Sequence, residues 1–310
     1  MESEPVFIIG ALMSSKKYVK KYLSGCGKIA LVISIRLKGL LMIEQPAMVK
    51  ICDIREESPL VKTLFFESSM NFIPGQFIMV WIPMVDEKPF TVSSIQKNLL
   101  GISVLKKGTF TDLLHQKRIG DTIGIRGPYG NGFHLQPELH SCVVGGGIGI
   151  ASLATVIDTL PKITIIQGTR TASEIIYRKR FTDMRFCTED GSLGFRGTTV
   201  DLLEDIVKKQ QFQKVYTCGP EKMMFKIVEL CKKHHIACEV SLDRYIKCGF
   251  GICGQCDCSG QRTCVEGPVF TIPELNTMED FGRVALLKTG ERVDVNNHRQ
   301  LSYISIDNAK

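Results

Sequence analysis

Two hydrophobic patterns divide the chain near residue 140. Before this point, short runs rich in β-branched and aromatic residues are separated by Gly and Pro, which is typical of strands joined by turns. The expected strands include Val61–Phe66, Gln76–Ile82, Ile102–Leu105 and Thr122–Ile125. Their spacing predicts an antiparallel β-barrel over residues 48–137.

After His140, short apolar strands alternate with longer stretches of helical periodicity. This order predicts a parallel sheet covered by helices on both faces. The expected strands are Ser141–Val144, Lys162–Gln167 and Lys214–Thr217, and the expected helices are Ala151–Leu160, Thr199–Gln210 and Glu221–His234. The predicted fold class is therefore β plus α/β: a barrel, a doubly wound domain over residues 138–240 and a small cysteine-rich segment over residues 241–270.

The two ends of the chain lack either pattern. Within residues 1–47, the apolar run Ile29–Ile43 carries two basic residues and is shorter than the roughly 20 apolar residues of a membrane-spanning helix. We expect an N-terminal extension, or a start assigned too early, with Met42 or Met48 as the true start. Residues 271–310 are expected to form a polar tail, and no membrane association is expected.

Composition narrows the function classes. The 310 residues are 44% hydrophobic and 23% charged, with a formal net charge of +7, which is ordinary for a globular protein. Lys and Arg form no dense run interleaved with aromatics, so no nucleic-acid partner is expected. Five of the 12 cysteines fall within residues 248–264, which favours a metal site over a disulfide framework.

The spacing of these cysteines is typical of plant-type clusters, in which four thiolates hold two irons. The expected ligands are Cys248, Cys253, Cys256 and Cys264. The interspersed glycines let the backbone wrap closely and aim N–H groups at sulfur. A zinc site and disulfides are the alternatives, although a four-residue gap breaks the usual zinc pattern of short cysteine pairs. Cys258 competes with Cys264 as the fourth ligand.

A second set of residues suggests a flavin site in the barrel. Lys88, Pro89, Phe90 and Thr91 are similar to the Arg-x-Tyr-Ser/Thr flavin signature of the ferredoxin reductase superfamily. A cation, an aromatic ring and a hydroxyl would face the pyrophosphate, the flavin ring and its reactive edge. A plain strand end is the alternative. Further contacts are expected where a short helix begins, because a helix N-terminus attracts phosphate. These contacts are Val104, Leu105, Lys106, Gly108 and Thr109.

A third set indicates a dinucleotide site in the α/β domain. Gly145, Gly146, Gly147 and Gly149 follow a strand and open a helix, the context that a phosphate-binding loop requires. Thr169 and Arg170 stand where a Rossmann fold carries an acidic residue. Arg170 would contact a 2′-phosphate or simply end a strand in solvent. Cys218, Gly219 and Pro220 form a turn expected beside the nicotinamide, with Cys218 either contacting the reacting ring or packing as a small buried residue.

In this order, the motifs resemble the electron transfer subunit of dihydroorotate dehydrogenase type B over residues 48–270, including the closing Gly267-Pro268-Val269-Phe270. Lys88 and Phe90 depart from the usual arginine and tyrosine. The resemblance implies a cytoplasmic oxidoreductase with FAD, a 2Fe–2S cluster and NAD. It also implies a role in pyrimidine biosynthesis and an FMN-containing catalytic dihydroorotate dehydrogenase partner, in a heterotetramer of two of each. Rival functions are the small subunit of a sulfide dehydrogenase or ferredoxin:NADP oxidoreductase, and a zinc-binding module without catalysis.

Overall fold

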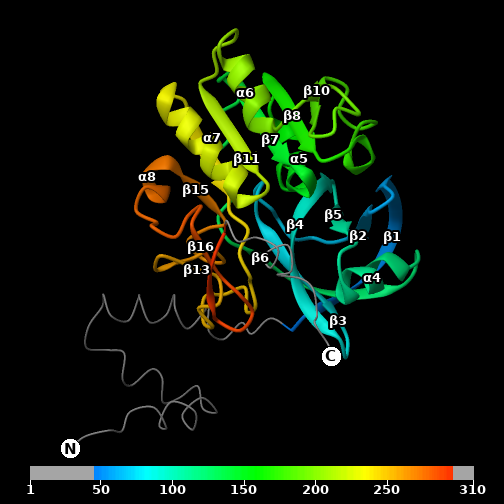
Figure 1. The fold of residues 1–310 in the computed structure, drawn as a ribbon. Coiled ribbons are helices and arrows are strands. Elements are labelled where there is room, and N and C mark those ends of the chain that lie inside the picture. Colours follow the sequence, from blue (N-terminus) through cyan, green and yellow to red (C-terminus); the bar gives the residue numbers. More distant parts are fainter. Residues whose placement is uncertain (1–44, 296–310) are drawn as a thin grey trace, which may run out of the picture. The chain divides into compact units, whose positions relative to one another are not determined.

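A closed antiparallel barrel forms the first part of the folded chain (Figure 1). The computed structural model describes residues 45–295. The barrel order is β1-β2-β5-β4-β3-β6. The elements are β1 (Ala47–Ser58), β2 (Val61–Glu67), β3 (Phe77–Ile82), β4 (Asp86–Gln96), β5 (Leu99–Leu105), α4 (Thr109–Gln116) and β6 (Thr122–Tyr129). The side chains of Leu64, Ile78 and Ile102 fill its interior, each with 0% exposure. The predicted barrel is thus confirmed.

A seven-stranded sheet of order β10-β9-β8-β7-β11-β12-β15 follows the barrel. All neighbouring strands are parallel except β12 and β15. The strands are β7 (Ser141–Gly146), β8 (Ile163–Thr169), β9 (Met184–Thr188), β10 (Phe195–Arg196), β11 (Lys214–Cys218), β12 (Ala237–Ser241) and β15 (Val269–Thr271). The helices are η1 (Gly147–Gly149), α5 (Ile150–Thr159), η2 (Ala172–Glu174), α6 (Thr199–Val207) and α7 (Glu221–Lys233).

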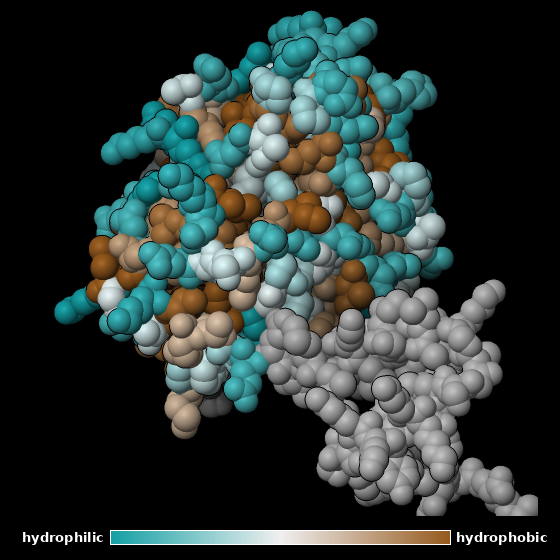
Figure 2. Space-filling model, turned by 180° about the vertical axis from the view of Figure 1, so that it is seen from behind, coloured by the Kyte–Doolittle hydropathy of each residue, from teal (hydrophilic) through white to brown (hydrophobic). Residues whose placement is uncertain are grey.

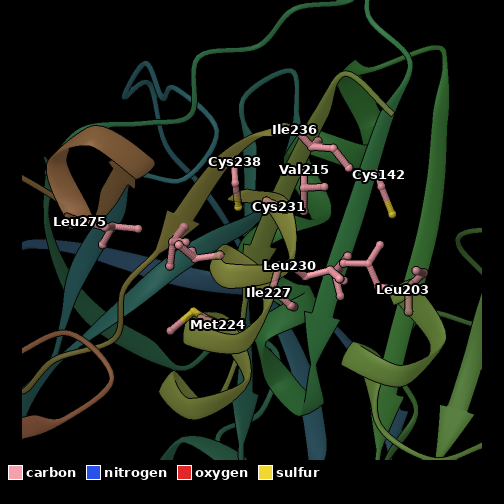
Figure 3. Packing of buried hydrophobic residues seen from close by; sticks show 14 of the residues in the cluster. Cys142, Leu203, Val215, Met224, Ile227, Leu230, Cys231, Ile236, Cys238 and Leu275 are labelled. Atoms are coloured by element: carbon pink, nitrogen blue, oxygen red, sulfur yellow. The ribbon is translucent and has the colours of Figure 1, made fainter. Parts of the chain in front are cut away.

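Alternating side chains of the sheet build two hydrophobic cores. On β7, Val143 packs in the core that α5 covers, whereas Cys142 and Val144 pack in the core beneath α6 and α7. Figure 3 shows the second core from close by, with Met224 and Ile227 of α7 among its members. Full burial of each large aliphatic side chain contributes about 1.5–3 kcal/mol. Helices on both faces make the sheet doubly wound, as the sequence predicts.

The C-terminal part returns to the edge of this sheet. β15 pairs with β12 in antiparallel orientation, which places Val269 and Phe270 in the core. Beyond it, the polar residues expected to form a tail fold into α8 (Ile272–Leu275) and a hairpin of β16 (Val284–Leu286) and β17 (Arg292–Asp294). The Gln255 amide donates to the carbonyl oxygen of Leu287 at 2.9 Å, so this hairpin packs on the cysteine segment. Short capped elements of this kind leave little hydrophobic periodicity in the sequence.

A buried contact joins the barrel to the sheet domain. The Tyr177 hydroxyl lies 2.5 Å from the Ser103 Oγ of β5, and the Arg180 guanidinium donates to the Ser93 carbonyl oxygen of β4 at 2.9 Å. Tyr177 has 1% exposure and a φ of +63°, which is unusual for a residue with a side chain. The packing of α5 on β4 adds to this interface.

The remaining predictions about the ends fall mostly outside the described residues. Nearly all of the expected N-terminal extension and the end of the expected tail fall on residues 1–44 and 296–310, which lie outside the described residues. Within residues 45–295, no helix is long and apolar enough to cross a membrane. On the face shown in Figure 2, hydrophilic and hydrophobic residues are interspersed.

Candidate functional site

The glycine loop lies where β7 passes into η1 and α5. Three of its glycines are required by packing within the protein. A Cβ at Gly145 would lie 2.7 Å from Ile150, one at Gly146 would lie 2.5 Å from the Met223 sulfur, and one at Gly149 would lie 2.4 Å from the Cys218 carbonyl oxygen. Gly147 differs, because it has a φ of +54° and no atom lies within 4 Å of a Cβ placed there.

The Cys218-Gly219-Pro220 turn lies directly against that loop. Cys218 ends β11 and pairs with Gly145 of β7. Its thiol is buried, and burial, assisted by the charge of Asp243, raises its pKa to about 11 against opposing hydrogen bonds from Ser152 and Ser241. The thiol is therefore protonated at neutral pH.

One hydroxyl connects the two domains at this point. Ser152 of α5 hydrogen-bonds the Cys218 thiol, and its own hydroxyl donates to the Thr91 Oγ1 of β4 at 3.1 Å. The structure thus brings together the last residue of the predicted flavin signature and the cysteine of the predicted nicotinamide turn. Ser152 belongs to no motif that sequence reasoning used, and only its place in the first turn of a helix after a glycine loop could have suggested it.

Asp243 and Lys107 also face this region. Asp243 follows β12, and desolvation raises the pKa of its carboxyl against the opposing charges of Lys107 and Arg244. Desolvation likewise lowers the pKa of Lys107, and the charge of Asp243 opposes that shift. Asp243 was absent from the sequence prediction.

The predicted flavin signature lies inside β4, with Lys88, Pro89, Phe90 and Thr91 opposite Val80, Met79, Ile78 and Phe77 of β3. The Lys88 ammonium forms an ion pair with Asp86 and lies 5.9 Å from the Tyr245 ring centroid. Phe90 stacks on Phe110 of α4, with ring centroids 6.2 Å apart. The cation and the aromatic ring of the signature thus both have protein partners.

The start of α4 is the second predicted phosphate contact. The N–H groups of Lys107 and Gly108 both donate to the Thr111 Oγ1, at 2.9 and 3.0 Å, and the Lys106 N–H donates to the Leu60 carbonyl oxygen at 2.8 Å. An anion here would have to replace Thr111 or use the N–H groups of Thr109 and the next residue. Of the other two predicted contacts, Val104 buries its side chain in the barrel core and Leu105 packs against the core beneath α5.

At the far end of β8, the residues expected near a ribose have protein partners. The Thr169 hydroxyl donates to the Thr171 carbonyl oxygen at 2.8 Å. The Arg170 guanidinium is exposed but forms an ion pair with Glu174 at 2.7 Å. Glu174 would repel a phosphate group placed beside Arg170.

The four predicted iron ligands meet as two pairs. Cys248 hydrogen-bonds Cys253, and Cys256 hydrogen-bonds Cys264, whose N–H lies 3.4 Å from the Cys256 sulfur. Among residues 45–295, no three His, Cys, Asp or Glu side chains converge on one point suited to a single ion. Two pairs of thiols supply two ligands to each iron of a two-iron cluster.

The loop around Cys248 favours a thiolate. Burial alone would raise the pKa of Cys248, but the backbone N–H groups of Cys253, Phe250 and Ile252 hydrogen-bond its sulfur and bring the pKa down to about 7. For Cys256, the hydrogen bond from Cys264 lowers the pKa by more than burial raises it, and the pKa is about 7 as well. Thiolates are the form that binds iron, so the donor set fits the group.

The cysteine segment packs on the outside of the barrel. Cys248, Cys256 and Cys264 share a cluster with Phe77 and Met79 of β3. The buried Arg126 of β6 fixes the segment there, because its guanidinium donates to the Cys248 carbonyl oxygen at 2.7 Å and to the Glu87 Oε1 at 2.6 Å. Arg126 was not predicted from the sequence, since an isolated strand arginine carries no motif.

Cys258 lies apart from the two pairs. It has 0% exposure, packs in the core beneath α7 and accepts a hydrogen bond from the Arg244 guanidinium at 3.3 Å. Of the two candidates for the fourth ligand, only Cys264 touches another predicted ligand.

The barrel, the doubly wound sheet and the cysteine segment together define an iron–sulfur flavoprotein of the ferredoxin reductase type. Two family models match: the oxidoreductase FAD-binding domain over residues 60–134 and the iron–sulfur cluster binding domain of dihydroorotate dehydrogenase B over residues 243–276. The chain belongs to the family of dihydroorotate dehydrogenase B electron transfer subunits. The predicted family, the FAD-binding barrel and the iron–sulfur segment are thus confirmed.

Individual relatives support this assignment. The chain is 42% identical over 259 residues to the probable dihydroorotate dehydrogenase B (NAD(+)) electron transfer subunit of Methanocaldococcus jannaschii, covering 81% of this chain and 99% of the relative. The protein of the same name from Methanothermobacter thermautotrophicus is 40% identical over 262 residues, covering 80% and 97%. A solved NADH-dependent reduced ferredoxin-NADP oxidoreductase, a flavin-based electron-bifurcating enzyme, has 27% identity and a TM-score of 0.67, covering 75% of this chain and 91% of that chain.

Proposed function

We propose that this chain transfers electrons from a dihydroorotate-oxidising catalytic subunit to NAD, in pyrimidine biosynthesis. In this proposal the catalytic subunit carries FMN, and electrons cross this chain through a 2Fe–2S cluster and FAD. A flavin supplies the exchange between one-electron and two-electron transfer. The observation that carries the proposal is the packing of the paired cysteines against the barrel wall at Phe77 and Met79. This packing keeps an electron path to the barrel short.

For the cluster, we assign Cys248, Cys253, Cys256 and Cys264 as the iron ligands. The support is their pairing and the N–H groups directed at Cys248. The chain's own part is to favour the thiolate form of Cys248 and Cys256 and to exclude water from Cys256 and Cys264, which have 1% and 2% exposure.

For the flavin, we assign Thr91 to the reactive edge and Phe90 to the ring, with Lys88 on the pyrophosphate side. The hydrogen bond from Ser152 supports the role of Thr91, because it fixes the hydroxyl at the junction of the barrel and the sheet domain. The remaining flavin contacts are assigned to Pro89, Val104, Leu105, Lys106, Gly108 and Thr109. The ion pair with Asp86 partly neutralises the charge of Lys88. We therefore expect Lys88 to bind a phosphate group more weakly than an arginine, which can donate two parallel hydrogen bonds.

For the nicotinamide cofactor, we assign Gly147 to the pyrophosphate, since it is the loop glycine with open space beside it. The neighbouring Gly145, Gly146 and Gly149 shape the loop, and Cys218, Gly219 and Pro220 line the nicotinamide side. We assign NAD rather than NADP, because the Glu174 carboxylate occupies Arg170 and would repel a 2′-phosphate beside Thr169.

For the partner, we assign the surface around Cys253 as its docking site. Cys253 is exposed, and the apolar side chains of Phe250, Ile252 and Val265 around it are 45%, 70% and 39% exposed. An exposed apolar group beside a redox centre suits a protein that must approach that centre closely. We further propose two copies of each subunit. We also propose a cytoplasmic location, in which the described cysteines, none of which forms a disulfide, stay reduced.

The test is reconstitution. The chain is purified without oxygen, its flavin and iron are counted, and the reduced protein is examined by electron paramagnetic resonance. We expect one FAD, two irons and a rhombic signal for each chain. Added to its FMN-containing partner, the chain should confer NAD reduction by dihydroorotate, and omission of the chain should abolish it. Zinc in place of iron, or full NAD reduction without the chain, would contradict the proposal.

A second candidate is the small subunit of a sulfide dehydrogenase or ferredoxin:NADP oxidoreductase. The similarity to the solved NADH-dependent reduced ferredoxin-NADP oxidoreductase favours it, at a TM-score of 0.67. The two functions differ in the large subunit that co-purifies with the chain. Recovery of a ferredoxin-oxidising flavoprotein instead of a dihydroorotate-oxidising one would decide for the second candidate.

A further inference from the structure

A buried arginine lies between the two predicted redox sites. Arg244 follows β12 and has 3% exposure. One of its guanidinium nitrogens donates to the Glu221 carboxylate at 2.7 Å, to the Cys258 sulfur at 3.3 Å and to the Val284 carbonyl oxygen at 3.2 Å, and a second donates to the other Glu221 oxygen. Three separate parts of the chain therefore meet on one side chain.

On one side, Glu221 connects Arg244 to the nicotinamide turn. Glu221 is the first residue of α7 and directly follows Pro220. Its side chain is 9% exposed, and it also accepts the Gly282 N–H at 2.7 Å. Pro220 in turn packs on the glycine loop, since a Cβ at Gly146 would lie 2.8 Å from its ring. A shift of Glu221 would therefore be felt at the surface that faces the nucleotide.

On the other side, Cys258 connects Arg244 to the cluster loop. Cys258 lies in β13 (Asp257–Cys258), two residues after Cys256, and is fully buried. The Thr263 N–H and hydroxyl hold the Cys256 carbonyl oxygen at 3.2 and 2.9 Å, so the backbone at this point has little freedom. Because Cys258 is two residues from Cys256 on this stiff backbone, an arginine that binds the Cys258 sulfur also limits movement of the backbone at Cys256.

The geometry points to Arg244 as a positioning residue that holds the nicotinamide turn and the cluster segment in a fixed relation. Within this role, Cys258 anchors the segment and binds no iron. The inference rests on the proposed function, which assigns a redox group to each side. If apolar residues could replace the buried Arg244–Glu221 ion pair without loss, the pair would contribute to stability alone. Here two guanidinium nitrogens pair with the two carboxylate oxygens of Glu221, while one of them also reaches the Cys258 sulfur and the Val284 carbonyl oxygen. A lysine has a single nitrogen and cannot form the two-nitrogen pair with the carboxylate.

Three variants test the role in the complete chain loaded with FAD and iron: Arg244→Gln, Arg244→Lys and Cys258→Ala. The readouts are the KM for NADH with ferricyanide as acceptor, and the midpoint potential and paramagnetic signal of the cluster. We expect both arginine variants to raise the KM by about fivefold with little change in kcat, and to shift the potential and the signal. We expect Cys258→Ala to keep its iron and the wild-type KM but to shift the potential.

Arg292→Gln is the matched control, because Arg292 lies on β17, beside the strand that carries Val284, and its side chain is 59% exposed while it pairs with Asp280. It should leave both readouts unchanged. Wild-type values in a folded, fully loaded Arg244→Gln would overturn the positioning role, as would full rescue by lysine or loss of iron from Cys258→Ala. If Arg244→Gln does not fold, an unchanged potential in Cys258→Ala overturns it. A wild-type chain without iron would instead overturn the proposed function.

Discussion

At the scale of single residues, the glycine loop shows how one motif contains two kinds of position. Gly145, Gly146 and Gly149 are required because neighbouring protein atoms leave no room for a Cβ. Gly147 has open space and a positive φ, so it is the position available to a ligand. The sequence pattern identifies all four glycines but does not separate these two kinds, because the atoms that fill the space come from other elements.

This distinction predicts different outcomes for two alanine substitutions. Gly149→Ala would place a Cβ 2.4 Å from the Cys218 carbonyl oxygen and should destabilise the fold by about 1–3 kcal/mol. Gly147→Ala should cost about 1 kcal/mol for its backbone conformation and should chiefly raise the KM for NADH. Thermal unfolding and NADH:ferricyanide kinetics measure the two effects. Equal losses of stability with an unchanged KM would remove Gly147 from the nucleotide site.

At the scale of elements, the strands and helices with strong periodicity were predicted and the weakly patterned ones were not. The predicted elements either are buried along almost their whole length or have one apolar face, as in β2, β7, β8, β11 and α7. β4 carries Lys88 and Pro89 and is mostly half-exposed in its first half, so its pattern resembles a loop. Its place as a strand depends on pairing with β3 and β5, which no local signal reports. The contact of Tyr177 with the barrel likewise depends on residues that are distant in the sequence, so no local pattern predicts it.

That contact between the barrel and the sheet domain yields a prediction for one arginine. Arg180 donates to the Ser93 carbonyl oxygen at 2.9 Å, forms an ion pair with Asp158 and lies 5.1 Å from the Tyr177 ring centroid. Arg180→Gln should lower the free energy of unfolding by about 1–2 kcal/mol, because it leaves a carbonyl oxygen and a carboxylate without this partner. Chemical denaturation measures it. The neighbouring Lys179→Gln, at an exposed position, serves as the control, and equal effects of both would argue against the contact.

At the scale of the whole molecule, the cysteine segment lies on the barrel instead of forming a separate module. Arg126 of β6 holds it from the barrel side, and Arg244, which follows β12, holds it from the side of the sheet domain. The exposed apolar side chains around Cys253 are then left facing outward. This is the surface that we propose as the docking site of the partner subunit.

The docking surface predicts a selective loss of assembly. Ile252→Asp should weaken binding of the catalytic subunit by about tenfold or more, because it places a charge in an apolar contact. Iron and FAD contents should stay at wild-type levels, and a binding titration with the purified partner measures the loss. Ile119→Asp is the control, since Ile119 is similarly exposed but lies in the turn between α4 and β6. An unchanged affinity in Ile252→Asp would place the partner elsewhere.

The sequence by itself determined the class of protein, because cysteine spacing, glycine runs and hydrophobic periodicity are local properties that the chemistry of each cofactor demands. The tertiary structure alone decided which residues meet. It separated Cys258 from the paired cysteines, brought Ser152 between Thr91 and Cys218, and placed Arg244 between Glu221 and Cys258. These contacts join residues from different strands and helices, and their energies depend on burial and on distances in space that the order of residues does not carry.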